Sequence, residues 1–550
     1  MALLSGKRAM MEQLLADGTR YIFGNPGTTE QAFMDMLQEY PALEFIMCLH
    51  EGVAVSMADA YARATRKPAL VELHIAPGLG NGMGMLHNAA VGHSPVVVYV
   101  GQGDSRTMFQ QPHLSGDLVG MARPLTKWAY EINHAVDLPQ ALRRAYKVAN
   151  EPPQGPVVLS IPVDTLDQEA EVRIEPTQHT KWRVGADAAG IAEAAELLAG
   201  AKKPMLLVGD QVALSGAQEL VGELAELVGA PIYQSYPTEV NVPTGHRLVS
   251  SSLPFIGSNA IREVVAQYDT LLAIGIPLFR VVFPEPGEYV PQSLKVIQID
   301  LDSWELGKNL SNVLSIKADP RAALTALIQQ LEGRRPAGAE DRANAIAADR
   351  ETRAAAQREA DRKGWDDVPI AVPRLMSELT GMLPEDVAVF DESVTSEPVL
   401  ARYLKVKKDN YFRARSGGLG PGMPGAVGLK LARPNQPVVG VVADGSAMYS
   451  ITALWTAAHH KVPVTWVICN NASYRILKLN LMEYLGPEND RLFMHTDIVD
   501  PAIRYDKLAE SLGVRGWRVE KPEELRPAFE AALSLDAPAL VDVSIQGRVR

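Results

Sequence analysis

The chain has 550 residues, of which 47% are hydrophobic and 21% charged, and its formal net charge is −12. At roughly 150 residues per domain, this length predicts three or four globular domains. The acidic balance argues against nucleic acid as a partner, because basic surfaces bind it.

Other bulk features predict a cytoplasmic enzyme. The sequence lacks an apolar stretch of roughly 18 residues, so we expect no transmembrane helix and no membrane partner. The first eight residues are too short to provide the apolar core of a signal peptide. The two cysteines, Cys48 and Cys469, lie in apolar runs and are expected to be reduced core residues.

Apolar runs alternate with helical patterns along most of the chain, which predicts an α/β fold of three doubly wound parallel-sheet domains. The first domain is expected over residues 1–170 and the second over 188–333, with an acidic connection at 167–187. A charged, alanine-rich segment at 334–363 predicts a solvated helical linker. The third domain is expected over 366–550. Strands are expected at 21–23, 45–49, 69–73, 96–100, 157–161, 205–210, 270–275, 296–300, 437–443 and 462–469.

Two side chains of the first domain are candidates for chemistry. Glu51 follows an expected strand and begins an expected helix. A glutamate there ordinarily complements the helix dipole, but in a poorly hydrated cleft it could exchange a proton with a ligand. His74 ends the next strand beside a glycine-rich segment. It is either a structural histidine or a catalytic one, since imidazole titrates near working pH.

Asp444-Gly445-Ser446 and Asn470-Asn471-Ala472-Ser473 follow two apolar runs of the third domain. The carboxyl ends of parallel strands are where open α/β sheets bind ligands. Asp and Asn oxygens suit Mg2+, which takes few protein ligands together with phosphate oxygens. Each segment alone is typical of a turn; together they indicate a diphosphate held through a metal.

These paired segments resemble the signature of the thiamine diphosphate (ThDP) enzymes, with Ala443 where that family usually has glycine. Phe23-Gly24-Asn25-Pro26-Gly27-Thr28-Thr29-Glu30 and the segment from Leu73 to Asn81 resemble the benzoylformate decarboxylase branch. Gly417-Gly418-Leu419-Gly420 is similar to the loop that wedges the cofactor into a bent conformation. Asp391-Glu392-Ser393-Val394-Thr395-Ser396 is similar to a loop beside the diphosphate. The resemblance spans nearly the whole chain.

The resemblance implies a ThDP- and Mg2+-dependent lyase that decarboxylates a 2-oxo acid to an aldehyde and can ligate it to an acceptor aldehyde. Glu51 would activate the cofactor, and His74 and Thr28 would handle the substrate. Asp444, Asn471 and Ser473 would hold the metal. The implied cofactor-binding set is Asn25, Pro26, Gly27, Glu51, Thr395, Ser396, Gly417, Leu419, Asp444, Gly445, Ser446, Asn471, Ser473 and Tyr474. A cleft shared between subunits implies a homo-oligomer, a dimer at least and a tetramer by expectation.

The chain also departs from that branch. Val282 stands where benzoylformate decarboxylase has a second histidine, and His113 is a candidate substitute or else an exposed loop residue. Arg413 takes the place of an aromatic pocket residue; it would suit a distal anion of the substrate or form a salt bridge at a subunit interface. Ile476 and Leu477 are expected to line the same pocket.

These departures argue against plain benzoylformate as the natural substrate. Three alternatives stay open from the sequence. They are a carboligase like acetohydroxyacid synthase, a lyase acting on acyl-CoA, and a ThDP-binding protein that has lost catalysis. The middle domain is expected to be structural.

Overall fold

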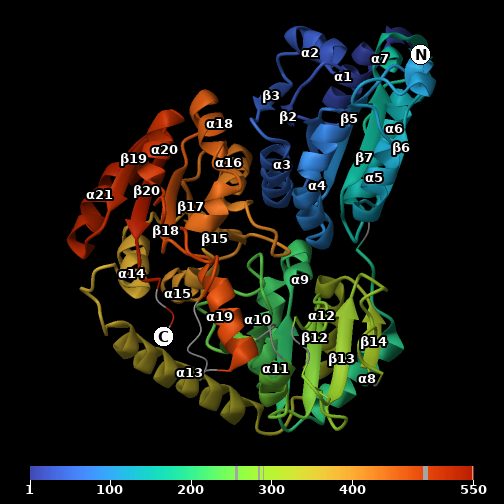
Figure 1. Cartoon of the computed structure of the whole chain (residues 1–550). Helices are drawn as coiled ribbons and strands as arrows, with labels where there is room; N and C mark the ends of the chain where they lie inside the picture. Colours follow the sequence, from blue (N-terminus) through green and yellow to red (C-terminus); the bar gives the residue numbers. More distant parts are fainter. Residues whose placement is uncertain are drawn as a thin grey trace. The chain divides into compact units, whose positions relative to one another are not determined.

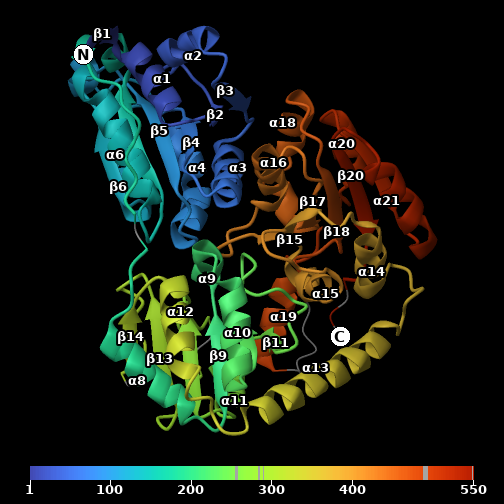
Figure 2. The same ribbon diagram turned by 180° about the vertical axis from the view of Figure 1, so that it is seen from behind.

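The computed structural model describes residues 1–181, 183–253, 258–282, 285–288, 290–311, 313–486, 493–547 and 549. They divide into two compact units. One contains residues 1–180, 364–403 and 414–550, and the other contains 181–363 and 404–413. Three six-stranded parallel sheets with flanking helices confirm the predicted α/β fold class (Figures 1 and 2).

The N-terminal sheet has the strand order β3-β2-β4-β5-β7-β6. Its four central strands, β2, β4, β5 and β7, are almost wholly buried, which explains their near-continuous apolar runs, whereas the edge strands β3 and β6 are partly exposed. The strands are β2 (Tyr21–Asn25), β3 (Glu44–Met47), β4 (Ala69–Leu73), β5 (Val96–Gln102), β6 (Trp128–Glu131) and β7 (Val157–Pro162). The helices are α1 (Gly6–Ala16), α2 (Gln31–Met36), α3 (Glu51–Thr65), α4 (Ile75–Val91), α5 (Leu118–Ala122), α6 (Leu138–Asn150) and α7 (Val163–Asp167).

The two faces of this sheet are covered by different helices. Side chains of α1, α2 and α6 form one apolar cluster with Leu70, Val97 and Leu159 of the strands. Helices α3 and α4 cover the other face, where a Cβ on Gly82 would lie 3.1 Å from the Leu73 side chain. Both catalytic candidates therefore lie at the carboxyl edge of this sheet, Glu51 at the start of α3 and His74 just before α4.

The expected acidic connection after residue 167 contains a strand that the sequence did not indicate. β8 (Glu169–Val172) pairs antiparallel with β1 (Ala2–Ser5), with Ala2 opposite Val172. The pairing joins segments far apart in the chain, and both strands are short and partly exposed. Neither strand therefore has the kind of apolar run that predicts the other strands from the sequence.

The middle sheet has the order β11-β10-β9-β12-β13-β14. Its strands are β9 (Pro204–Val208), β10 (Ile232–Gln234), β11 (Val249–Ser252), β12 (Thr270–Ile274), β13 (Lys295–Asp300) and β14 (Val313–Lys317). Its helices are α8 (Ala188–Ala199), α9 (Asp210–Ser215), α10 (Gln218–Val228), α11 (Ser258–Val265) and α12 (Pro320–Leu331). Helix α13 (Ala339–Asp361) follows and is exposed along most of its length, as its charged composition predicts.

The C-terminal sheet has the order β16-β15-β17-β18-β20-β19. Its strands are β15 (Ala388–Glu392), β16 (Tyr411–Arg413), β17 (Val438–Ala443), β18 (Thr465–Asn470), β19 (Arg515–Val519) and β20 (Ala539–Ser544). Its helices are α14 (Val372–Met382), α15 (Glu397–Tyr403), α16 (Gly422–Ala432), α17 (Asp444–Met448), α18 (Ala453–His459), α19 (Arg475–Leu485), α20 (Tyr505–Ser511) and α21 (Leu525–Leu533).

Helices α3 and α16 join the N-terminal and C-terminal sheets of the first unit and lie side by side in both views (Figures 1 and 2). Their backbones approach so closely that a Cβ on Gly428 would lie 2.1 Å from the Met57 carbonyl oxygen. Glycine is therefore required at this crossing. In the described part of the chain, no helix combines the length and hydropathy needed to cross a membrane.

Candidate active site

Asp444 and Asn471 lie at the carboxyl ends of neighbouring parallel strands. β17 ends at Ala443, which pairs with Cys469 near the end of β18. The Asp444 carboxylate accepts hydrogen bonds from the backbone N–H of Gly445 at 2.9 Å and of Ser473 at 3.3 Å. The Asp444 side chain is buried, and burial raises its pKa to about 6. Such a carboxylate gains stability from a bound cation.

The Asn471 side-chain oxygen, Oδ1, is buried and has no hydrogen-bond partner among the described residues. An unpaired buried acceptor is costly. A carboxylate oxygen and a free amide oxygen at adjacent strand ends are the donor types that a hard divalent cation takes. On this observation, the residues present fit a metal-bound diphosphate.

The backbone around this pair is tightly constrained. A Cβ on Gly445 would lie 2.6 Å from the Tyr474 ring, so only glycine leaves the ring in place. Ser473 forms an isolated β-bridge with Asp497, and its hydroxyl donates to the Thr496 carbonyl oxygen at 3.1 Å. The structure thus brings four residues of the predicted cofactor set together: Asp444, Gly445, Ser473 and Tyr474.

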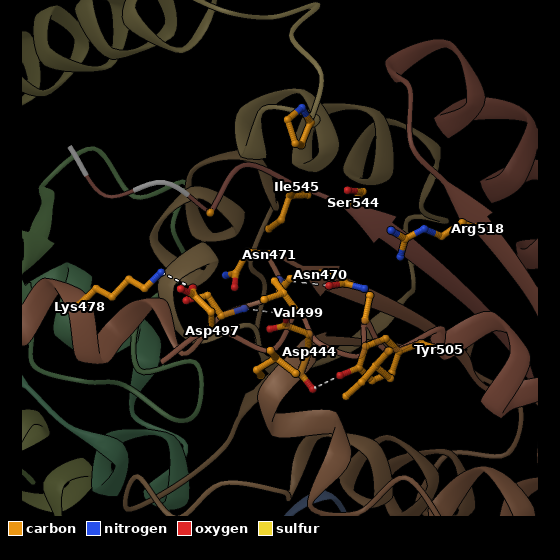
Figure 3. Close-up of a pocket in the computed structure, with 17 residues that line it drawn as sticks. Asp444, Asn470, Asn471, Lys478, Asp497, Val499, Tyr505, Arg518, Ser544 and Ile545 are labelled. Atoms are coloured by element: carbon orange, nitrogen blue, oxygen red, sulfur yellow. Dashed lines mark hydrogen bonds and ion pairs between the residues drawn. The ribbon is translucent and has the colours of Figure 1, made fainter. Parts of the chain in front are cut away.

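A cavity of about 460 Å³ opens against these residues (Figure 3). All of its lining residues belong to the C-terminal part of the chain, residues 369–547. The lining carries both signs of charge, with Lys478 paired to Asp497 at 2.5 Å and Arg518 paired to Asp542 at 2.6 Å. Glu51 is not in this lining. Within one chain, this cavity therefore contains the predicted metal ligands but not the predicted catalytic glutamate.

The glycine loop that contains Leu419 is fixed by a buried carboxyl group. Glu392 accepts the backbone N–H of Gly420 at 2.8 Å and of Gly422 at 2.6 Å. Burial raises the pKa of Glu392 to about 8, although both hydrogen bonds act in the opposite direction. Asn88 of α4 donates to the Gly418 carbonyl oxygen at 3.0 Å, which ties the loop to the N-terminal sheet. Leu419 itself is partly buried.

Glu51 is the first residue of α3 and is only 7% exposed. Its carboxylate accepts a hydrogen bond from the Asn81 side-chain amide at 3.1 Å. A Cβ on Gly78 would lie 3.2 Å from the other carboxylate oxygen, so the glycine-rich start of α4 leaves room for this group. The carboxyl group is therefore held in a poorly hydrated place by α4, as its proposed role requires.

His74 is paired with Glu30, which has no exposed surface on its side chain. The imidazole Nδ1–H donates to Glu30 Oε2 at 2.8 Å. Glu30 also accepts the Gly27 backbone N–H at 2.9 Å and the Thr29 hydroxyl at 2.6 Å. This arrangement leaves Nε2 as the ring nitrogen that can exchange a proton with a ligand. A Cβ on Gly27 would lie 2.2 Å from the imidazole, so the loop backbone packs directly on the ring.

Several predicted residues lie apart from these groups. Thr28 is exposed, whereas its neighbour Thr29 makes the contacts with Glu30 and His74. His113 is exposed in the loop after residue 110, and that loop approaches the start of α4, where a Cβ on Gly116 would lie 3.2 Å from Ala76.

In the second unit, Val282 is 55% exposed, and the Arg413 guanidinium lies 4.1 Å from the centre of the Tyr236 ring. In the first unit, Ile476 and Leu477 follow Arg475 in the first turn of α19, and Leu477 is half exposed. Asn25 ends β2, and Pro26 follows it in the loop that leads to Glu30.

Thr395 and Ser396 lie in a short 3-10 helix after β15, and Gly417 has a φ of 80°. Ser446 is buried against Glu392.

Three contact residues were not identified as site residues from the sequence. The sequence indicates Glu30 only as part of a motif, and Asn81 and Glu392 only as members of glycine-rich or acidic segments. Each acts through a partner that is 28 to 44 residues away in the chain. Their polar side chains within these loops were the only feature of the sequence that could have indicated these contacts.

Three models of thiamine pyrophosphate enzyme domains match the chain. The N-terminal TPP-binding domain matches residues 4–118, the central domain 191–327 and the C-terminal TPP-binding domain 394–543. Thiamine pyrophosphate is ThDP.

Similar proteins cover nearly the whole chain. A benzoylformate decarboxylase from Pseudomonas aeruginosa is 32% identical over 98% of each chain. A probable acetolactate synthase large subunit from Methanococcus aeolicus is 26% identical over 98% of this chain and 92% of its own. The solved structure of a ThDP-dependent 4-hydroxybenzoylformate decarboxylase from Rhodococcus jostii is 30% identical, covers 99% of this chain and 100% of its own, and has a TM-score of 0.86. The chain therefore belongs to the thiamine pyrophosphate enzyme family, which confirms the relationship to benzoylformate decarboxylase that its motifs indicated.

Proposed function

We propose that this enzyme decarboxylates a 2-oxo acid to an aldehyde with ThDP and Mg2+, and that it ligates the aldehyde unit to an acceptor aldehyde when one is present. The main support is the full-length match to a benzoylformate decarboxylase. The site geometry agrees with it, because acidic and amide groups follow two neighbouring strands of the domain that matches the C-terminal TPP-binding model. The two buried free cysteines support a cytoplasmic location.

The metal would be held by the Asp444 carboxylate, the Asn471 amide oxygen and the Ser473 main-chain oxygen. The supporting observation is the buried, unpartnered Oδ1 of Asn471. When bound, ThDP supplies an electron sink that stabilises the negative charge left after CO2 departs. Leu419 would support the bent form of the cofactor from its partly buried loop. The diphosphate would be bound by Gly445, Ser446, Thr395, Ser396 and their neighbours.

The remaining groups act on the cofactor ring and the substrate. Glu51 would exchange a proton with the pyrimidine part of the cofactor from its largely dry position at the start of α3. His74 would orient the substrate carboxylate and move protons at Nε2, since Nδ1 is committed to Glu30. Thr28 and His113 are both exposed and are proposed to meet the substrate. Arg413, Ile476 and Leu477 are proposed to contact its distal part.

We expect a homo-oligomer, a dimer at least and a tetramer by preference. The cavity against Asp444 is lined by residues 369–547 and not by Glu51, which supports a site completed by Glu51 of another copy of the chain. Sedimentation velocity on the holoenzyme is expected to show a dimer or a tetramer. A monomer that is fully active would contradict the shared site.

Glu30→Gln is expected to lower kcat by about 10²-fold, within the range ascribed to a positioned acid or base. The amide of glutamine can donate to Nδ1 and so reverse the tautomer of His74. Steady-state kinetics with bound ThDP checks this prediction. Thr29→Val, which removes only one donor to Glu30, is the matched control and should cost less than about tenfold. Equal losses in the two variants would contradict the tautomer argument.

A carboligase is the second candidate, because an acetolactate synthase relative also matches over almost the full chain. Product analysis with and without an acceptor aldehyde separates the two. Free aldehyde formed without acceptor supports the decarboxylase. Turnover only with acceptor supports the carboligase. Turnover only with acyl-CoA substrates would overturn both.

A further inference from the structure

Glu72 is a buried carboxyl group that the proposed mechanism does not use. It lies within β4, two residues before His74, and its surface is fully buried. Neither of its carboxylate oxygens has a hydrogen-bond partner in the described part of the structure. A buried carboxylate without a partner is strongly disfavoured, so the protonated acid is the stable form. Burial, with Glu30 and Glu51 nearby, raises the pKa of Glu72 to about 9.

The strand register places Glu72 inside the sheet, between β2 and β5. Glu72 pairs with Gly24 of β2 and with Tyr99 of β5. A Cβ on Gly24 would lie 2.5 Å from a Glu72 carboxylate oxygen, so the absence of a side chain at residue 24 makes room for the acid. The Tyr99 hydroxyl is also buried without a partner among the described residues. Tyr99 belongs to the apolar cluster that the strands form with α1, α2 and α6, on one face of the sheet.

The titratable groups that act on Glu72 come from every neighbouring segment. They are Glu30 before α2, Cys48 after β3, Glu51 at the start of α3 and Tyr99 on β5. His74 follows two residues after Glu72, just beyond the end of β4. Glu30 accepts three hydrogen bonds, which suits the charged form. Glu72 accepts none. Of two buried carboxyl groups close together, the one without donors keeps the proton.

We propose that Glu72 is protonated in the resting enzyme and is a positioning residue for His74, and that its ionisation sets the alkaline limit of activity. The inference rests on the catalytic role proposed for His74. Glu30 is the carboxyl group that holds the imidazole. When base removes the Glu72 proton, the O–H bond breaks and a negative charge appears on the sheet face near Glu30. That charge perturbs the hydrogen-bonded Glu30–His74 pair on which the proposed mechanism depends.

The first test is kcat/KM of the holoenzyme against pH for the wild type and Glu72→Gln. Glutamine has nearly the same shape as the neutral acid and does not ionise. We expect the wild type to lose about tenfold per pH unit above about pH 9, and the variant to lack this alkaline limb. Asp300→Asn is the matched control. It removes a buried carboxyl of the other unit, one whose pKa burial raises to about 6, and should keep the wild-type limb. Identical limbs in all three proteins would overturn the proposal.

A second test does not depend on turnover. The infrared difference spectrum of wild type minus Glu72→Gln is expected to show the carbonyl band of a protonated carboxyl group at pH 7, which disappears with a midpoint near pH 9. The difference separates Glu72 from Glu392, whose pKa burial raises to about 8 and which also keeps a proton at pH 7. Glu30→Gln should move the midpoint of the Glu72 band to lower pH by removing the neighbouring carboxyl group. A difference spectrum without this band at pH 7 refutes the protonated Glu72. An intact band in an enzyme with no decarboxylase activity would instead refute the proposed function.

Thermal unfolding provides the third readout. The pKa of Glu72 is higher in the folded chain than in the unfolded chain. Its contribution to stability is therefore complete below about pH 4.5 and is lost as pH rises to about 9. The Tm of Glu72→Gln minus the Tm of the wild type should therefore increase as the pH rises from about 4.5 to about 9. A difference in Tm that does not change with pH would show that glutamine alters packing only.

Discussion

Glu51→Gln is expected to lower kcat by about 10²- to 10⁴-fold while ThDP remains bound, the range found when a positioned acid or base is removed. The structure supports a large effect because Glu51 is only 7% exposed and is held by Asn81 at 3.1 Å. Glutamine keeps the size and one acceptor oxygen but cannot take or give the proton. The measurement is single-turnover and steady-state kinetics with ThDP occupancy determined separately.

Asn81→Ala is the graded control for this prediction. It removes the donor to Glu51 but leaves the carboxyl group, so the loss should stay below about tenfold, the usual range for one hydrogen bond. A Glu51→Gln enzyme with wild-type kcat would show that Glu51 only complements the dipole of α3. That was the alternative that its place in the first helical turn left open.

Asp444→Ala is expected to reduce the joint affinity for ThDP and Mg2+ by about 10²-fold or more, since a metal–carboxylate interaction contributes several kcal/mol. The protein without cofactor should keep its Tm, because burial already disfavours the charged form of this group and raises its pKa to about 6. Thermal unfolding with and without ThDP and Mg2+ measures both effects. The wild type should gain Tm on binding, and the variant should not at the same concentrations.

Asp497→Asn provides the matched control. Asp497 lines the same cavity, but its carboxylate is paired with Lys478 at 2.5 Å and is not a predicted metal ligand. Its replacement should leave the gain in Tm on cofactor binding close to that of the wild type. An equal loss of cofactor binding in both variants would indicate a general effect of charge in the cavity and would contradict the assignment of Asp444.

The sequence was most informative where function depends on the end of a buried strand. The runs before Asp444 and Asn471 are strands β17 and β18, and their parallel pairing brings both residues to one edge of the sheet. Glu51 and His74 likewise follow the strands expected before them. In each case a continuous apolar run identifies the strand, and the next polar residue identifies its functional end.

Contacts across the fold could not be predicted in this way. The pairing of Glu30 with His74 depends on how the loop after β2 folds over the end of β4, which no spacing in the sequence encodes. For the same reason the sequence did not indicate that Thr29 contacts both Glu30 and His74. In the sequence, Glu72 is the single polar residue of the expected strand at 69–73. Its burial between Gly24 and Tyr99 is known only from the register of the sheet.

Release of CO2 from a panel of 2-oxo acids is the decisive measurement for the proposed decarboxylase. The panel contains benzoylformate, pyruvate, branched aliphatic acids and dicarboxylic acids, each measured with and without ThDP and Mg2+. We expect CO2 release without any acceptor aldehyde, and only when both ThDP and Mg2+ are present. Preference for a dicarboxylic acid would support Arg413 as the group that binds a distal anion. An enzyme that binds ThDP and Mg2+ yet releases no CO2 from any member of the panel would contradict the decarboxylase.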